Sequence, residues 1–160
     1  MLVPFESLPE EARIWVYQSN RPFTEEEIKH ITKDLEAFLT QWTAHGSDLQ
    51  AGYELPYNRF IVIGLDQSGA SASGCSIDAS VHFLQALESK YGVTLLDRMN
   101  VTYKQGEYLT YKSLDEFRKM AKARSVSSKT IVFNNLVANK QDYTENWEVP
   151  ASESWHSRFF

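Results

Sequence analysis

The chain has 160 residues, of which 42% are hydrophobic and 23% charged, values typical of a single folded domain rather than a disordered segment. Its formal net charge of −5 disfavours a general role in coating DNA, RNA or an anionic membrane, and no stretch approaches the roughly 20 apolar residues that cross a bilayer. A single cysteine, Cys75, excludes an internal disulfide and is ordinary in a reducing compartment, so we expect a cytoplasmic protein.

The first predicted elements are a strand and a capped helix. Residues 13–17 are rich in β-forming residues, which predicts a strand. Thr24 and Glu27 have the spacing of a capping box, and apolar residues then recur every three or four positions as far as Trp42. This pattern predicts an amphipathic helix whose apolar stripe faces the core. We expect the helix to end near Gly46, because glycine readily takes the left-handed conformation that closes helices.

A hairpin and a second helix follow. Residues 49–55 and 59–65 resemble two strands separated by a short turn, and the second is apolar enough to be a central strand. A loop of small residues, 66–76, then leads into a helix predicted over about 77–91. This strand, loop and helix form the segment that is most informative about function.

The next segments are a strand pair and a third helix. Residues 101–103 and 108–111 flank Gly106, so they form either a tight hairpin or one strand with a bulge at the glycine. Ser113 and Glu116 again have capping-box spacing, which predicts a helix beginning at Ser113.

The chain closes with a short strand and an aromatic tail. We predict a strand over residues 130–133 and expect residues 146–160 to dock on the domain, with Trp147 and Trp155 largely buried, because disordered tails are poor in aromatic residues. Residues 1–160 are then one α+β domain, an antiparallel-rich sheet covered by about three helices. The order of the elements resembles a ferredoxin-like sandwich with extensions.

The loop of residues 66–76 is the first candidate site. Free amides and the helix dipole at a helix N-terminus favour an anion. However, the chain lacks the G-x-x-x-x-G-K-[ST] pattern and contains no Gly-Lys pair, so we expect no ATP hydrolysis. The loop is either a closely packed helix entry or one wall of a pocket for a small ligand. The residues expected to line such a pocket are Asp66, Ser73, Gly74, Ser76, Asp78, Trp42 and Trp155.

Cys75 is the candidate nucleophile, because the positive end of a helix dipole stabilises a thiolate. Cys75, Asp78 and His82 share the polar side of the predicted helix, but seven residues span about 10 Å along its axis, too far for Cys75 and His82 to form a hydrogen bond. His45 or His156 would have to act as the base instead. The alternative is that Cys75 is a small buried hydrophobic residue.

Metal binding and the binding of a macromolecule are two further possible functions. The four histidines are widely scattered, so we expect no metal site, and the sequence identifies no cofactor. The helix after Ser113 has a basic face, which together with the aromatic tail offers an alternative function as a non-catalytic module that binds a protein or RNA. The basic residues of that face are Arg118, Lys119, Lys122 and Arg124.

Several segments taken together carry a family resemblance. The segments are residues 21–24, 41–46, 72–78 and 146–156. Over essentially its whole length the chain resembles a family of small uncharacterised bacterial proteins whose members are often labelled ABC transporter ATPase. This chain lacks the Walker residues that such a label requires, and the family supplies no established catalytic residues. The resemblance therefore points to a family but does not imply an activity. The leading hypothesis remains a small-ligand pocket at residues 66–76 and the following helix start, with thiol chemistry at Cys75 if a base lies near it.

Overall fold

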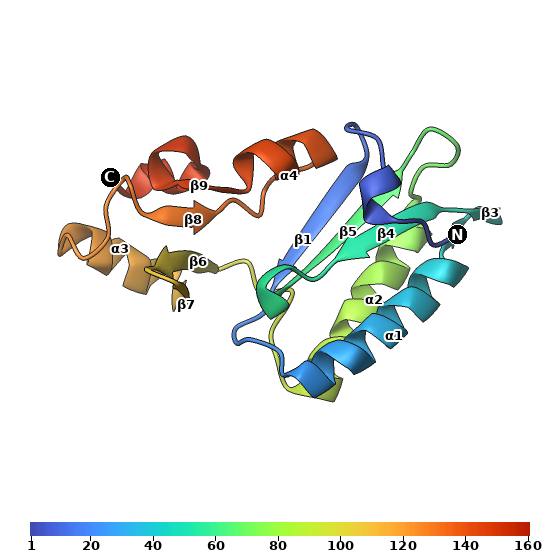
Figure 1. The fold of residues 1–160 in the computed structure, drawn as a ribbon, viewed down its shortest axis with the longest axis horizontal. Coiled ribbons are helices and arrows are strands. Elements are labelled where there is room, and N and C mark those ends of the chain that lie inside the picture. The colour runs from blue at the N-terminus through green and yellow to red at the C-terminus, as the bar shows by residue number, and fades with distance from the viewer.

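The computed structural model describes all 160 residues and contains four α-helices and nine strands, which confirms the α+β class (Figure 1). In chain order these elements are β1 (Arg13–Gln18), α1 (Glu25–Gln41), β2 (Thr43–Ala44), β3 (Ser47–Asp48), β4 (Gln50–Glu54), β5 (Phe60–Asp66), α2 (Gly74–Tyr91), β6 (Asn100–Gln105), β7 (Tyr108–Ser113), α3 (Leu114–Lys122), β8 (Ile131–Phe133), α4 (Lys140–Asn146) and β9 (Glu148–Pro150). Short 3₁₀ turns lie at η1 (Phe5–Ser7), η2 (Pro56–Asn58), η3 (Ala151–Glu153) and η4 (Trp155–Phe159).

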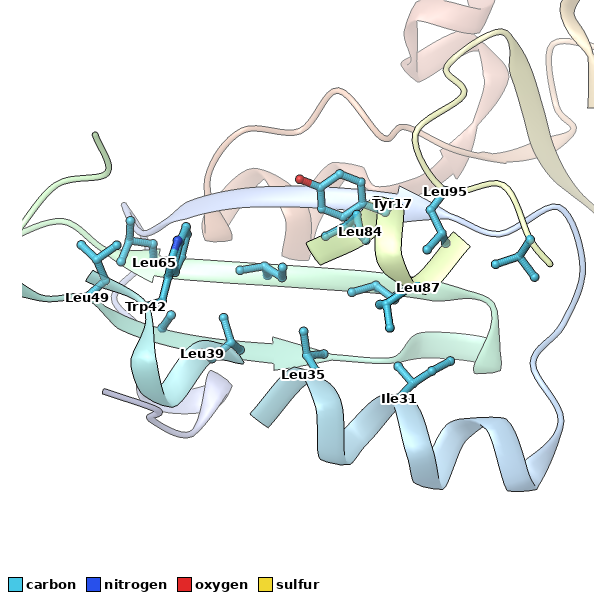
Figure 2. Close-up of a cluster of buried hydrophobic side chains, with 14 of the residues drawn as sticks. Tyr17, Ile31, Leu35, Leu39, Trp42, Leu49, Leu65, Leu84, Leu87 and Leu95 are labelled. Carbon is cyan, nitrogen blue, oxygen red and sulfur yellow. The ribbon is translucent and has the colours of Figure 1, made fainter. Parts of the chain in front are cut away.

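The first sheet has three strands in the order β1-β5-β4, and both pairings are antiparallel. As predicted, β5 is the central strand, and six of its seven residues are buried. Helices α1 and α2 cover one face of this sheet (Figure 1). The apolar stripe of α1 points into the space between the helices and the sheet, where it meets leucines of α2 (Figure 2). The labelled core residues in that layer include Ile31, Leu35, Leu39, Leu84, Leu87 and Tyr17.

The second sheet has four strands in the order β7-β6-β8-β9, again antiparallel. Strands β6 and β7 form the tight hairpin that the sequence left open, with Gly106 at φ 65° in its turn. Helix α3 and the C-terminal turn η4 pack around Phe117, which is fully buried. This sheet lies beside the first one, at the opposite end of the molecule from α1 and α2 (Figure 1).

The ferredoxin-like arrangement is not confirmed, because the seven strands outside the small β2–β3 ladder divide between two sheets. Helix α1 joins β1 to β4, and β5 inserts between them, as in the first half of that fold. The chain that leaves α2 does not return beside β1. It forms β6, which pairs with β7 and β8 instead.

Two helix boundaries differ from the predictions. Helix α1 ends at Gln41 rather than near Gly46, since Trp42 already has extended backbone and residues 43–48 form the small β2–β3 ladder. The turn of that ladder takes positive φ at both His45 and Gly46. Helix α2 begins at Gly74, three residues before the predicted start, because Ser73 caps it. Helix α4 was not predicted.

The C-terminal residues pack on the rest of the chain. Strand β9 pairs with β8, and Trp147 is only 7% exposed. His156 is 1% exposed. Trp155 is less deeply buried than Trp147 but keeps the smaller part of its surface exposed, and it stacks along one side of His156. Both indoles are therefore largely buried, as expected. No helix in the structure is long and apolar enough to span a bilayer.

Polar side chains join the two sheets. The Gln18 Oε1 atom at the end of β1 accepts hydrogen bonds from Thr102 and Asn135, and Asn135 in turn accepts one from the indole of Trp147. Arg59 donates to three main-chain carbonyl groups, one of them on β7. Because buried polar groups are costly unless paired, these bonds fix how the two sheets meet.

Candidate functional site

The candidate site is a groove at the start of α2. Ser73 caps this helix: its hydroxyl accepts from the Ser76 amide, and the Ser76 hydroxyl in return accepts from the Ser73 amide. Cys75 therefore lies within the first helical turn rather than in the preceding loop, and its side chain is exposed. The alternative that Cys75 is a buried hydrophobic residue is wrong.

Trp42 is the most deeply buried aromatic residue in the lining of the groove. It is the C-cap residue of α1, it is 3% exposed, and its Nε1 atom donates a 2.8 Å hydrogen bond to the Ser76 carbonyl oxygen. This buried bond ties the end of α1 to the first turn of α2. Phe38 lies against the indole, with 5.7 Å between ring centroids, and stacks on Phe83 of α2 at 4.6 Å.

The small β2–β3 ladder supplies another part of the lining. It places His45 at its turn, so that the imidazole and Cys75 line the same groove, which has a volume of about 550 Å³. The complete lining is Phe38, Gln41, Trp42, Thr43, His45, Ser73, Cys75, Ser76 and Ala79. Of the predicted site residues, Trp42, His45, Ser73, Cys75 and Ser76 thus come together. We call this feature the α2 groove.

Other predicted residues do not line the α2 groove. Asp66 closes a local turn by accepting from the amide and hydroxyl of Ser68, and those bonds lower the pKa of its carboxyl. Asp78 and His82 are exposed on α2 and make no ion pair with each other. Gly74 is the first residue of α2 and has no side chain that could enter the groove.

The lining of the α2 groove contains no lysine, arginine, aspartate or glutamate. The amide groups of Gly74 and Cys75 have no hydrogen-bond partner. Those two amides are the positive end of the α2 dipole. No hydrogen bond joins Cys75 to a histidine, although His45 lines the same groove. The arrangement therefore supports binding through aromatic contact and amide donors more directly than it supports nucleophilic catalysis.

Trp155 and His156 line a different cavity, of about 60 Å³, between the two sheets. The imidazole stacks on Trp155 at 3.8 Å, and its Nδ1 atom shares a 2.7 Å hydrogen bond with the Ser154 hydroxyl. Burial, with a smaller contribution from the charge of Arg158, lowers the pKa of His156 to about 4. His156 is therefore neutral at pH 7. No residue lines both this cavity and the α2 groove, so the structure does not pair His156 with Cys75.

Sequence reasoning missed several residues of the cavity between the sheets. Arg98 and Asn135 both line it, yet each lies in an irregular segment outside any motif. Their position depends on how the two sheets meet, which no local pattern signals.

No cluster of three or more histidine, cysteine, aspartate or glutamate side chains is arranged to hold a metal ion. No family model, curated protein or solved structure matches the chain.

Proposed function

We propose that the protein binds a small ligand in the α2 groove. The observation that carries the proposal is the convergence of three separate segments on one concave surface: the end of α1, the β2–β3 turn and the first turn of α2. The buried bond from Trp42 to Ser76 holds two of these segments together without a ligand. A preformed concave site with aromatic walls and a few polar groups is the usual form of a small-molecule site.

The chemistry of the walls selects the class of ligand. Phe38, which is partly exposed, offers aromatic surface, and the free amide of Cys75 offers a donor to an acceptor or a single negative charge. The lack of a basic side chain in the lining disfavours polyphosphates. The best-fitting ligand is a small molecule with an aromatic or apolar body and one acceptor or weakly anionic group.

Cys75 lines this groove, and its thiol is exposed to solvent. A thiol nucleophile requires a base in contact with it, and no such contact is present. We therefore propose binding as the primary function, with Cys75 serving as a reporter of occupancy. Reaction at the thiol would require His45, whose turn would have to move toward α2.

A titration with 1-anilinonaphthalene-8-sulfonate tests the proposal, since this probe combines aromatic rings with one negative charge. Nuclear magnetic resonance should show shifts of the Gly74 and Cys75 amides and of the Trp42 indole. Ala79→Trp should abolish these shifts, because Ala79 is an exposed residue that lines the groove. Gln85→Trp is the matched control, since Gln85 is exposed on the same helix outside the groove. Shifts confined to other surfaces, or equal binding by both variants, would refute the proposal.

A further inference from the structure

The cavity between the two sheets has a buried inner end and an open mouth. Its volume is about 60 Å³. Gln18 and His156, which are both buried, line its inner end. Asp97, Arg98 and Leu136 are exposed and line its mouth. The hollow therefore runs from the surface inward to the imidazole, and we call it the intersheet cavity.

One buried nitrogen atom faces the intersheet cavity without a partner. His156 is 1% exposed, and its Nδ1 atom is bonded to Ser154, whereas its Nε2 atom makes no hydrogen bond. No fully covered side-chain nitrogen or oxygen in the structure lacks a hydrogen bond, so Nε2 retains a small accessible surface. Because His156 lines the intersheet cavity, that surface opens into it. A buried polar atom without a partner is costly, so Nε2 favours a polar group placed inside the cavity.

The amide side chains at the inner end already have partners. The Gln18 Oε1 atom accepts hydrogen bonds from Thr102 and Asn135. The Asn135 Oδ1 atom accepts one from the indole of Trp147. These oxygens need no ligand to satisfy them, in contrast to Nε2 of His156.

The charges of the cavity exclude an ionic group from its inner end. Asp97 and Arg98 place one negative and one positive charge at the mouth, so together they add no net charge. Burial lowers the pKa of His156 to about 4, so the imidazole is uncharged at pH 7. An ion that reached Nε2 would lose its water without meeting an opposite charge, which is costly. The inner end therefore selects an uncharged group.

The size and walls of the cavity narrow the class of ligand further. One water molecule needs about 10–15 Å³ of such space, so a cavity of about 60 Å³ admits a head group of about four non-hydrogen atoms. Phe133 and Trp155 supply aromatic wall. Nε2 is a donor or an acceptor according to the tautomer of His156, and an amide group satisfies either, because it carries both a donor and an acceptor.

We propose that the intersheet cavity is a second ligand site, which takes the amide end of a small uncharged molecule and bonds it to Nε2 of His156. The rest of the molecule leaves through the mouth, where Leu136, 62% exposed, offers apolar contact. The two proposed sites are separate, since no residue lines both the intersheet cavity and the α2 groove.

Acetamide and acetate test this proposal, because they have nearly the same size and shape but differ in charge. Acetamide should shift the Nε2 nitrogen resonance of His156 along a saturating curve. The titration runs to about 100 mM, since a ligand of about four atoms makes few contacts. Acetate should bind there at least about tenfold more weakly. Equal binding by acetate would overturn the uncharged class, and no saturating shift with acetamide would show that the cavity holds water only.

Two variants locate the bound acetamide, with the Trp155 indole resonance as the readout. His156→Phe keeps an aromatic ring but removes Nε2, so it should weaken acetamide at least about tenfold, whereas His82→Phe, at an exposed residue of α2, should not. Leu136→Trp narrows the mouth without touching the core and should also weaken binding. Met99→Trp is its control, at an exposed residue outside the lining. Full acetamide binding by either His156→Phe or Leu136→Trp would place acetamide elsewhere and overturn the proposal.

Discussion

At the scale of single residues, Trp42 connects the core to the candidate site. Its indole belongs to the same core cluster as Leu39 of α1 (Figure 2). Its Nε1 atom donates a hydrogen bond to the Ser76 carbonyl oxygen in the first turn of α2. Trp42→Phe keeps an aromatic ring but removes the donor. We expect it to lower the free energy of unfolding by about 1–3 kcal/mol, measured by urea denaturation, because the bond is buried. Trp155→Phe is the control, since the Trp155 indole makes no hydrogen bond, and a larger loss there would contradict this assignment.

His156 makes a separate prediction about pH. Its pKa falls from 6.5 to about 4 on folding, chiefly because of burial. Above about pH 6.5 the imidazole is neutral in both states, and as the pH falls toward 4 only the unfolded chain takes up the proton. Stability should therefore fall across that window, by on the order of 3 kcal/mol.

Urea denaturation at a series of pH values measures this effect. The fall in the free energy of unfolding between pH 6.5 and 4.5 should be smaller in His156→Gln than in the wild type. Glu27 affects stability at lower pH. Its hydrogen bond to Arg21 lowers its pKa from 4.5 to about 2 on folding, so the stability it provides is lost only as the pH drops from about 4.5 toward 2. Identical slopes in the wild type and His156→Gln would show that His156 is not the titrating group.

At the scale of elements, α1 depends on its N-terminal cap. Thr24 and Glu27 form a complete capping box, and Arg21 makes a two-pronged ion pair with Glu27. Thr24→Ala should cost about 1 kcal/mol of stability in chemical denaturation. Thr40→Ala on the same helix removes only an exposed hydroxyl bonded to its own helix and should be nearly neutral. Equal losses in both variants would mean that the cap contributes nothing specific.

The helix predictions succeeded where local chemistry decides the structure. The capping residues Thr24 and Ser113 set the starts of α1 and α3 as expected, because a cap satisfies backbone groups within a few residues. The end of α1 was placed too late, since the buried bond of Trp42 to α2 favours leaving the helix there and depends on a contact 34 residues away. Helix α4 is short, and only the cap at Asn139 marks its start in the sequence.

At the scale of the whole molecule, Trp147 joins the two sheets. Its ring lies 4.9 Å from both Phe60 of β5 and Phe133 of β8, measured between centroids. Trp147→Ala should therefore cost about 3–5 kcal/mol, with both sheets still unfolding in one transition followed by circular dichroism. Trp155→Ala, at a partly exposed ring of the same C-terminal segment, should cost less. A loss at Trp147 no larger than at Trp155 would show that the sheets do not depend on this contact.

The division into two sheets also explains how far the candidate site could be predicted. Trp42, His45, Ser73 and Cys75 belong to segments that were singled out by composition, and the α1–α2 layer brings them together. His156 was grouped with them on residue type alone. Its separation from Cys75 follows from β6 pairing with β7 and β8 rather than with β1, and strand pairing over such distances leaves no periodic signal in the chain.

The most direct test of ligand binding in the α2 groove uses the thiol that lines it. Because Cys75 is exposed, iodoacetamide should alkylate it in the native protein without denaturant. Increasing concentrations of 1-anilinonaphthalene-8-sulfonate should slow that alkylation until it reaches a plateau, in the wild type and in Gln85→Trp alike. An alkylation rate that stays constant while the probe is bound would place the probe elsewhere and contradict the proposed site.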